Sequence, residues 1–426
     1  MKRTVVFALA GLLVQSLTPL ARAQEATAQS RIVKLADLLA EAGRNNPQIQ
    51  AARHGWDAAK QVSTQVSTLP DPQIVLQQFS VGSPRPFAGY TNSDFAYIGL
   101  GFSQDIPYPG KLHLQGEIAK KDADVLNERY ESVRREILDE VKQVYFQLAY
   151  LSERGKVLDD DQDLLRQIEE SVEARYRSGE GNQQEVLQAQ LEQTKVLRDI
   201  TANQLETGKM QAALKQLLNR PQTSPDIDVA AISETALPYT YEQLLEAAKA
   251  SNPDIAAMQS MVEKQELQID VAKKDFYPDF NVQYLWQRTD PTQFRAYYML
   301  TFGVRIPIYR RRRQQPELAQ AEADRNRSQS EYEAQFQQVA FELRQQYVSA
   351  EKSSELLKIY HDGLIPQARA ELQAGLATYQ SNRENFQALL ASFLDVLKLN
   401  EEYWQTLSEH ETSLAQIEEL TGLNLH

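Results

Sequence analysis

The feature that most restricts the fold of this chain is a long proline-free stretch between Pro109 and Pro221. Within it, apolar residues recur in steps of three, four and seven, which is typical of one face of an α-helix. A helix from Gly110 to Arg177 would hold about 68 residues and measure about 100 Å at roughly 1.5 Å per residue. The sequence therefore predicts an elongated molecule. The apolar positions are Leu126, Tyr130, Val133, Ile137, Val141, Val144, Leu148, Leu151, Leu158, Leu165, Ile168 and Val172.

The chain also carries one set of landmarks twice, in the same order. KLADLLAEAGRNNP (34–47) resembles YTYEQLLEAAKASNP (239–253), and each reads as an amphipathic helix that ends in Asn-Pro. We therefore expect two repeats, residues 24–220 and 239–426, joined by a Pro-rich linker at 221–238. The other paired landmarks are Leu69-Pro70-Asp71 with Tyr277-Pro278-Asp279, Ile106-Pro107 with Ile306-Pro307, and Tyr176-Arg177-Ser178-Gly179 with Tyr379-Gln380-Ser381-Asn382.

Each expected repeat contains two short stretches in which apolar residues alternate with polar or small ones. Such alternation is typical of β-strands with one apolar face. The strands are expected at about 72–81, 95–105, 279–287 and 296–306, and a length of roughly nine or ten residues suits a tilted strand that crosses a membrane. The predicted fold is mainly α, with a small membrane β part.

Four such strands cannot close a barrel alone, and an open sheet edge is not tolerated in hydrocarbon, so several chains must share one barrel. Two chains would give eight strands and a filled interior, whereas three would give twelve strands and an open lumen. A soluble sandwich with the same aromatic residues in its core is the alternative. The lumen-facing set is expected to be small and polar: Gly99, Gly101, Ser103, Thr301 and Gly303. The lipid-facing aromatic residues are expected to be Tyr284, Trp286, Tyr298 and Phe302.

The first residues read as a secretory signal peptide at 1–23, with Lys2 and Arg3 before an apolar run and a small-residue cleavage site at Ala21–Ala23. Its removal takes away three positive charges and changes the formal net charge from −13 to −16, which argues against a nucleic-acid partner. The chain has no cysteine, so neither disulfides nor tetrathiolate metal sites are expected. The five histidines are scattered, and we predict no metal site and no cofactor.

Taken together, the duplicated Asn-Pro helix, the strand pairs that end at Ile106-Pro107 and Ile306-Pro307, and the two tyrosine-containing tips resemble the TolC-like outer-membrane factors of Gram-negative bacteria. The resemblance implies a homotrimer with a shared 12-stranded β-barrel in the outer membrane and an α-helical barrel in the periplasm. It also implies a periplasmic adaptor and an inner-membrane transporter as partners. The long helices would be residues 111–177 and 312–377, with 47–68 and 183–219 as the first stacked pair of shorter helices.

Within that family, the segments Leu69–Pro72 and Gln104–Lys111 are similar to the heavy-metal branch of CzcC- or CusC-like channels. Four residues lie where strands are expected to meet helices: Pro107, Pro109, Gly110 and Pro307. The alternative is that such residues set the geometry of the joints and carry no information about the cargo.

The resemblance places a periplasmic aperture at the two helix tips, near 176–182 and 379–385. The family often has two acidic residues in its second repeat. The corresponding residues here are Ala388 and Ala391, so this chain departs from the family pattern. Glu185 is the best candidate for an acidic constriction, although a solvated carboxylate at a helix end is the alternative. The full set of aperture candidates is Tyr176, Gly179, Glu180, Glu185, Tyr379, Asn382 and Glu384.

The run Arg310, Arg311, Arg312 and Arg313 is expected to open the second long helix, where four cations oppose the helix dipole. Because this run follows the last expected strand, anionic lipid headgroups at the inner leaflet of the outer membrane are the expected partners, and plain solvation is the alternative.

The chain has no P-loop, G-x-S-x-G or H-E-x-x-H pattern, so we expect a passive conduit rather than an enzyme. The expected function is the outer-membrane channel of a tripartite efflux system, with metal ions as one cargo. A soluble periplasmic helical adaptor and a type I secretion channel are the alternatives.

Overall fold

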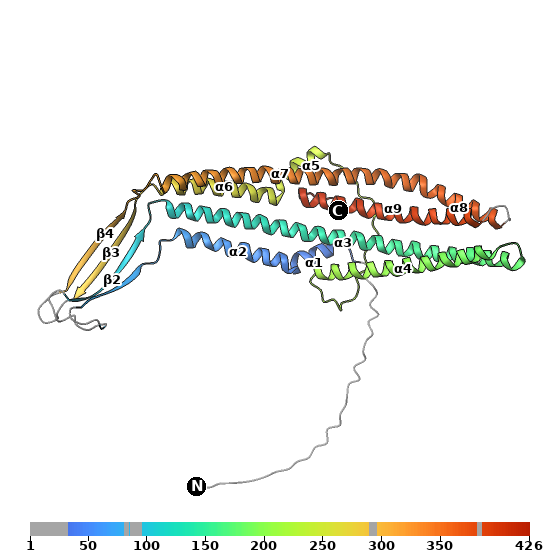
Figure 1. The fold of residues 1–426 in the computed structure, drawn as a ribbon, viewed down its shortest axis with the longest axis horizontal. Coiled ribbons are helices and arrows are strands. Elements are labelled where there is room, and N and C mark those ends of the chain that lie inside the picture. The colour runs from blue at the N-terminus through green and yellow to red at the C-terminus, as the bar shows by residue number, and fades with distance from the viewer. Residues whose placement is uncertain (1–32, 81–84, 86–95, 289–295, 381–385) are drawn as a thin grey trace, which may run out of the picture.

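The computed structural model describes residues 33–80, 85, 96–288, 296–380 and 386–426. The signal-peptide prediction and the aperture candidates Asn382 and Glu384 lie outside these residues. The described chain is elongated, with a β-sheet at one end and a helical body that occupies the rest of its length (Figure 1).

The same order of elements occurs twice along the chain. That the chain is a duplicated unit stays a prediction, with which this order agrees. The first set is α1 (Leu35–Asn45), α2 (Pro47–Ser67), β1 (Gln73–Phe79), β2 (Tyr97–Ile106), α3 (Lys111–Ser178) and α4 (Gln183–Leu217). The second set is α5 (Tyr241–Ser251), α6 (Pro253–Lys274), β3 (Asp279–Arg288), β4 (Tyr297–Arg305), α7 (Gln314–Ile359), the π-helical turn η1 (Tyr360–Leu364), α8 (Ile365–Gln380) and α9 (Phe386–Thr421).

Helix α3 is one continuous helix of 68 residues, which confirms the prediction from its apolar periodicity. Glycines in the left-handed conformation flank it, with φ of 91° at Gly110 and 80° at Gly179. Among the described helices, none contains an apolar segment of the length and hydropathy needed to cross a membrane.

The second long helix differs from the expected 312–377. The arginine run lies in a turn that precedes α7, because the backbone N–H groups of Arg312 and Arg313 donate to the carbonyl of Tyr309 at 2.9 and 3.0 Å. The helix then passes without interruption through the π-helical turn at Tyr360–Leu364 into α8. The first long helix has no such turn, so the two differ in their internal geometry.

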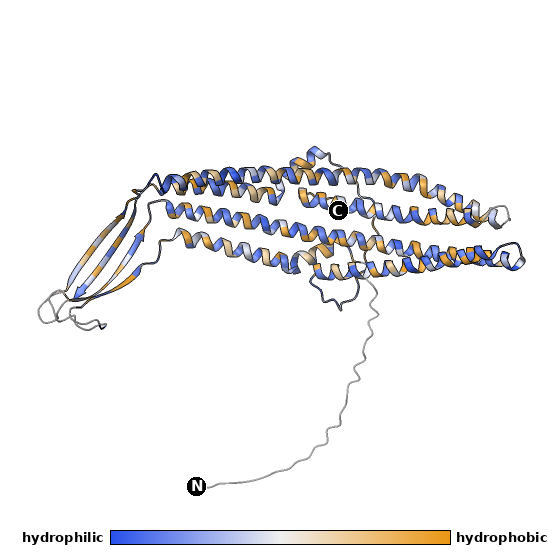
Figure 2. Ribbon diagram, viewed as in Figure 1, coloured by the Kyte–Doolittle hydropathy of each residue, from blue (hydrophilic) through white to orange (hydrophobic). Residues whose placement is uncertain are grey.

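The four strands form one antiparallel sheet in the order β1-β2-β3-β4. In this register, Phe102 lies opposite both Ile74 and Tyr284, while Gly101 lies opposite both Val75 and Leu285. The apolar residues of neighbouring strands therefore share one face, as the alternation predicted. Along the strands, hydrophobic and hydrophilic residues are interspersed (Figure 2). The apolar face consists of Ile74, Leu76, Ile98, Leu100, Phe102, Ile106, Phe280, Val282, Tyr284, Trp286, Tyr298, Leu300, Phe302 and Val304.

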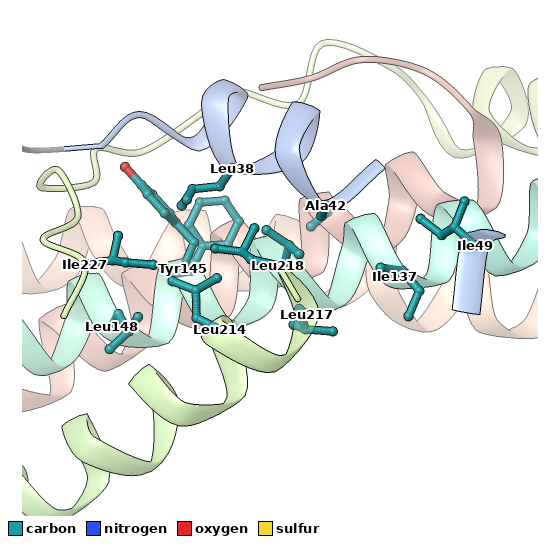
Figure 3. Packing of buried hydrophobic residues seen from close by; sticks show 13 residues of the cluster. Leu38, Ala42, Ile49, Ile137, Tyr145, Leu148, Leu214, Leu217, Leu218 and Ile227 are labelled. Carbon is teal, nitrogen blue, oxygen red and sulfur yellow. The ribbon is translucent and has the colours of Figure 1, made fainter. Parts of the chain in front are cut away.

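Packing in the helical body replaces the disulfides that a cysteine-free chain cannot form. Near the middle of the body, Leu38 and Ala42 of α1 pack against Tyr145 of α3 and Leu214 of α4, and all four are buried (Figure 3). A second buried cluster fills the space between the hairpins α3–α4 and α8–α9, and a third joins α5 and α6 to α7 and α9. The buried clusters fix the hairpins relative to one another, and so position the tips.

Candidate functional site

The first helix tip is a tight turn between α3 and α4. The backbone N–H groups of Glu180 and Gly181 both donate to the carbonyl of Arg175, at 2.9 and 3.1 Å. These bonds need the left-handed conformation at Gly179, which glycine adopts without steric cost. Helix α4 then starts at a capped end, because the Asn182 Oδ1 accepts a hydrogen bond from the backbone N–H of Glu185 at 3.1 Å.

The second tip contacts the first through Tyr379, near the end of α8. Its side chain is 99% buried, and the Arg175 guanidinium carbon lies 4.5 Å from the centre of its ring. Arg175 also donates to the Tyr379 carbonyl at 3.4 Å, and the Tyr379 hydroxyl donates to Glu185 Oε2 at 3.5 Å. Burial, together with the negative charge of Glu185, raises the pKa of Tyr379, so the phenol remains a neutral donor at physiological pH. We call Arg175, Glu185 and Tyr379 the tip cluster.

A pair of amides adds a second contact between the hairpins, next to the tip cluster. Gln188 of α4 and Gln387 of α9 donate to one another, at 3.4 and 2.6 Å. The two tips are therefore held together by both an aromatic contact and reciprocal hydrogen bonds.

The described aperture candidates differ in their contacts and in their exposure to solvent. It brings Glu185 and Tyr379 into contact, whereas Tyr176 is 47% exposed and Glu180 is exposed at the turn. Arg175 was not singled out in the sequence, where its only signal is that of a basic residue in the last turn of a helix. Its contact with Tyr379 joins residues 204 positions apart, which local pattern does not indicate.

The joint between strands and helices contains a second cluster of polar residues. The Lys111 ammonium group lies 2.9 Å from a carboxylate oxygen of both Asp275 and Asp279, and its side chain is 9% exposed. Asp279 also accepts a hydrogen bond from the backbone N–H of Tyr108 at 2.8 Å, and the Tyr108 ring stacks on Tyr277 with centroids 4.6 Å apart. The first joint is thus tied to the start of β3.

Burial acts to lower the pKa of Lys111, but hydrogen bonds and charge attraction from Asp275 and Asp279 outweigh it and raise the pKa above its ordinary value. Lys111 therefore remains charged over the physiological range. The predicted joint residues Pro107, Pro109 and Gly110 lie between β2 and α3, and Pro307 lies between β4 and α7. The sequence indicates the prolines of the joints, but it carries no local sign of the ion pairs from Lys111 to Asp275 and Asp279.

The corresponding joint of the second set of elements contains the arginine run. Arg313 pairs with Glu317 at 3.2 Å, and Arg310 donates to the carbonyl of Phe276 at 3.4 Å. Arg311 and Arg312 are exposed. Elsewhere in the described chain, no three acidic or histidine side chains gather in a way that could hold a metal ion.

The comparisons with known proteins agree with this architecture. The sequence profile of the outer membrane efflux protein family matches residues 38–220 and 244–381. No match was found among curated protein sequences.

Several solved structures share the fold. The chain is similar to the outer-membrane channel OprN, with 17% identity, a TM-score of 0.78, and coverage of 92% of this chain and 90% of that one. It resembles VceC from Vibrio cholerae, with 18% identity, a TM-score of 0.76, and coverage of 92% and 97%. For CusC the identity is 17% and the TM-score is 0.79, with coverage of 98% and 100%. Because these identities are nearly equal, the heavy-metal branch stays a prediction.

The family profile covers most of the chain, in both sets of elements. Proteins of this family are passive conduits rather than enzymes, and they lie in the outer membrane of Gram-negative bacteria and extend into the periplasm. The chain therefore belongs to the outer membrane efflux protein family.

Proposed function

We propose that three copies of this chain form the outer-membrane channel of a tripartite efflux system. The channel accepts substrates from an inner-membrane transporter and its periplasmic adaptor, and releases them outside the cell. The observation that supports this most directly is the four-stranded sheet, which has one apolar face and two outer strands, β1 and β4, that pair with no further strand among the described residues.

The edges of this sheet require neighbours. Each edge strand would expose unpaired N–H and C=O groups, and hydrocarbon offers no water to satisfy them. If β1 of one copy pairs with β4 of the next, three copies close a ring of twelve strands with no free edge. The apolar face then contacts lipid, and the face that contains Gly101, Gln283 and Thr301 lines the lumen.

The helical bodies of the three copies would surround a periplasmic tunnel of about 100 Å, the length of a helix such as α3 at roughly 1.5 Å per residue. The ends of the hairpins α3–α4 and α8–α9 lie far from the sheet (Figure 1). In the proposed trimer, the tip cluster of each copy would lie at this end, beside the aperture of the tunnel. Contact between Arg175 and Tyr379 holds the two tips of one copy together, and Glu185 contributes a negative charge beside them.

The inner-membrane transporter selects the cargo, because a tunnel lined by polar side chains admits many kinds of solute. Metal ions are the cargo that the segments Leu69–Pro72 and Gln104–Lys111 indicate through their resemblance to the heavy-metal branch.

Fractionation combined with reconstitution tests the proposal. The protein should be found in the outer membrane, run as a trimer on unheated gels, and form ion-conducting channels in planar bilayers. Recovery as a stable monomer in periplasmic extract would contradict the proposal and favour a soluble adaptor. Export of proteins but not of small solutes, measured in cells that lack their own channel, would favour a type I secretion channel.

A further inference from the structure

The segment between β4 and α7 combines exposed apolar and exposed cationic side chains. Ile306, Ile308 and Tyr309 are 62%, 72% and 69% exposed, respectively. The four arginines that follow are all exposed as well. We call residues 306–313 the arginine joint. Such a combination is typical of the boundary between hydrocarbon and headgroups, where apolar and aromatic side chains enter the membrane and cations remain at its surface.

The position of the arginine joint agrees with this boundary. It follows directly after Arg305, the last residue of β4, whose neighbours Phe302 and Val304 lie on the apolar face of the sheet. It ends at Arg313, directly before Gln314, where α7 and the helical body begin. If the sheet spans the membrane as proposed above, the arginine joint lies at the leaflet that faces the periplasm.

Among the described residues, the charge of the arginine joint is not neutralised. The run contains four arginines, and within that part of the chain only Glu317 pairs with one of them, Arg313. The nearby carboxylates Asp275 and Asp279 are both engaged with Lys111. Within the described part of the chain, Arg311 and Arg312 form no ion pair. The chain as a whole carries a formal net charge of −13, so this excess of cations is local.

The first joint shows that the fold does not require such a run. There the segment Tyr108-Pro109-Gly110 leads into α3 with a single cation, Lys111, which is buried and paired with two carboxylates. Four cations before a helix also oppose its dipole, so the run carries an electrostatic cost within the chain. An anion bound beside them would offset that cost.

We propose that the arginine joint binds the phosphate of an anionic phospholipid in the leaflet that faces the periplasm. This inference rests on the proposed membrane function. Arg311 and Arg312 donate to the phosphate oxygens, for which the planar guanidinium group is well matched. Ile306, Ile308 and Tyr309 contact the glycerol and the first part of the acyl chains. A trimer has three such sites.

Binding of phosphatidylglycerol tests the proposal. The purified trimer is titrated with phosphatidylglycerol and, separately, with zwitterionic phosphatidylcholine, and bound lipids are counted by native mass spectrometry. The wild type should prefer phosphatidylglycerol, and added salt should weaken that preference. Arg311→Gln with Arg312→Gln should reduce the preference about fivefold for each arginine removed.

Two variants separate the site from charge in general. Arg311→Lys with Arg312→Lys keeps the charge but loses the forked geometry, so it should retain part of the preference. Arg166→Gln with Arg198→Gln removes two exposed arginines of the helical body, each of which pairs with an aspartate on its own helix, and should leave the preference unchanged.

An unchanged preference in the Arg311→Gln, Arg312→Gln variant would overturn the proposal, and so would equal loss in the variant of the helical body. A preference for the lipid A part of lipopolysaccharide over phosphatidylglycerol would also contradict it, because that lipid occupies the opposite leaflet. Channel conductance in phosphatidylcholine bilayers is recorded for each variant. Retained conductance shows that the channel function stands even where the lipid proposal fails.

Discussion

Asn46 and Asn252 make the same set of hydrogen bonds in the two halves of the chain. Each side-chain oxygen caps the helix that follows, accepting from two backbone N–H groups, and each amide donates to the end of another helix. Asn46 donates to the Leu217 carbonyl at 2.9 Å, and Asn252 donates to the Leu420 carbonyl at 3.1 Å. One side chain therefore stabilises two helix ends at once, and it does so at equivalent places in both halves.

Replacing either asparagine by alanine should destabilise the helical body. The loss of the cap costs about 1 kcal/mol, and the carbonyl left without a donor costs about 1–3 kcal/mol more. We therefore expect a free energy of unfolding lower by about 2–4 kcal/mol in Asn46→Ala. Thermal unfolding followed by circular dichroism measures the change. Asn46→Asp keeps the cap but loses the donor, so it should lose less; equal losses in the two variants would contradict the dual role.

Replacing Glu185 by glutamine should lower the preference of the channel for cations. In the proposed trimer, three copies of Glu185 lie around the aperture, and the field of a narrow ring of carboxylates attracts cations. The reversal potential across a planar bilayer with a salt gradient measures this preference. The matched control is Glu206→Gln, which removes an exposed carboxylate that pairs with Lys209 further along α4. If the two variants give the same reversal potential, the charge of Glu185 does not set the cation preference of the channel.

Replacing Arg175 by alanine should loosen the contact between the two tips. The guanidinium group over the Tyr379 ring and its hydrogen bond to the Tyr379 carbonyl are both lost, and a cation–π contact alone is worth about 0.5–2 kcal/mol. We expect longer or more frequent open states in single-channel recordings. Arg177→Ala is the control, because Arg177 is exposed and pairs with Glu173 on its own helix. Open times that do not differ between the two variants would exclude a role for Arg175 in closure.

Replacing Asp161 by asparagine should stabilise the protein at neutral pH and not at acidic pH. Burial, with a smaller contribution from the charge of Asp160, raises the pKa of Asp161 to about 7. Because the folded state binds this proton more tightly than the unfolded state, wild-type stability falls as pH rises from about 4 to about 7, by up to about 4 kcal/mol. The variant lacks this loss.

Melting temperatures measured across that pH range test the expectation for Asp161→Asn. The variant and the wild type should agree near pH 4, and the variant should melt higher above pH 7. Asp163→Asn serves as the control, because Asp163 is exposed and pairs with Arg166. A constant difference between Asp161→Asn and the wild type at every pH would contradict the titration of Asp161.

Replacing Gly101 by alanine should prevent the sheet from forming with its present register. A Cβ atom there would lie 2.1 Å from the backbone oxygen of Tyr284 and 2.8 Å from the Cα of Leu285, so β2 and β3 would have to separate. The same change at Gly303 meets only an ordinary contact at 3.5 Å with Asn281. The yield of heat-resistant trimer in outer membranes should therefore fall sharply for Gly101→Ala and stay near wild type for Gly303→Ala. Similar yields would show that the two strands can shift to admit the methyl group.

The elements of this fold could be predicted from sequence wherever a regular period runs along them. The apolar stripe from Leu126 to Val172 gave the length of α3, and the alternation from Ile98 to Phe102 gave the apolar face of the sheet. Periodicity reports how one element is buried, and it does so at every position. It carries little information about which single side chains meet across elements.

The contacts that were not predicted join residues far apart in the chain. Lys111 meets Asp279 across 168 positions, and Arg175 meets Tyr379 across 204. A charged residue near a helix end reads the same in sequence whether it is solvated or paired, so neither contact had a local signal. The π-helical turn at Tyr360–Leu364 was not predicted either, because one extra residue in a turn barely alters an apolar stripe of that length.

The edge strands β1 and β4, which pair with no further strand in the part of the chain that the structure describes, also predict an order of events for the proposed assembly. A single chain that entered the membrane first would leave the backbone groups of these strands without partners in hydrocarbon, so in the proposed trimer the chains should meet before they insert. The rate at which channels assemble should consequently increase more than in proportion to the rate at which the chain is secreted. In a cell that secretes this chain slowly, monomers should therefore accumulate in the periplasm. The number of trimeric channels should be lower than a simple proportion to the secretion rate would give.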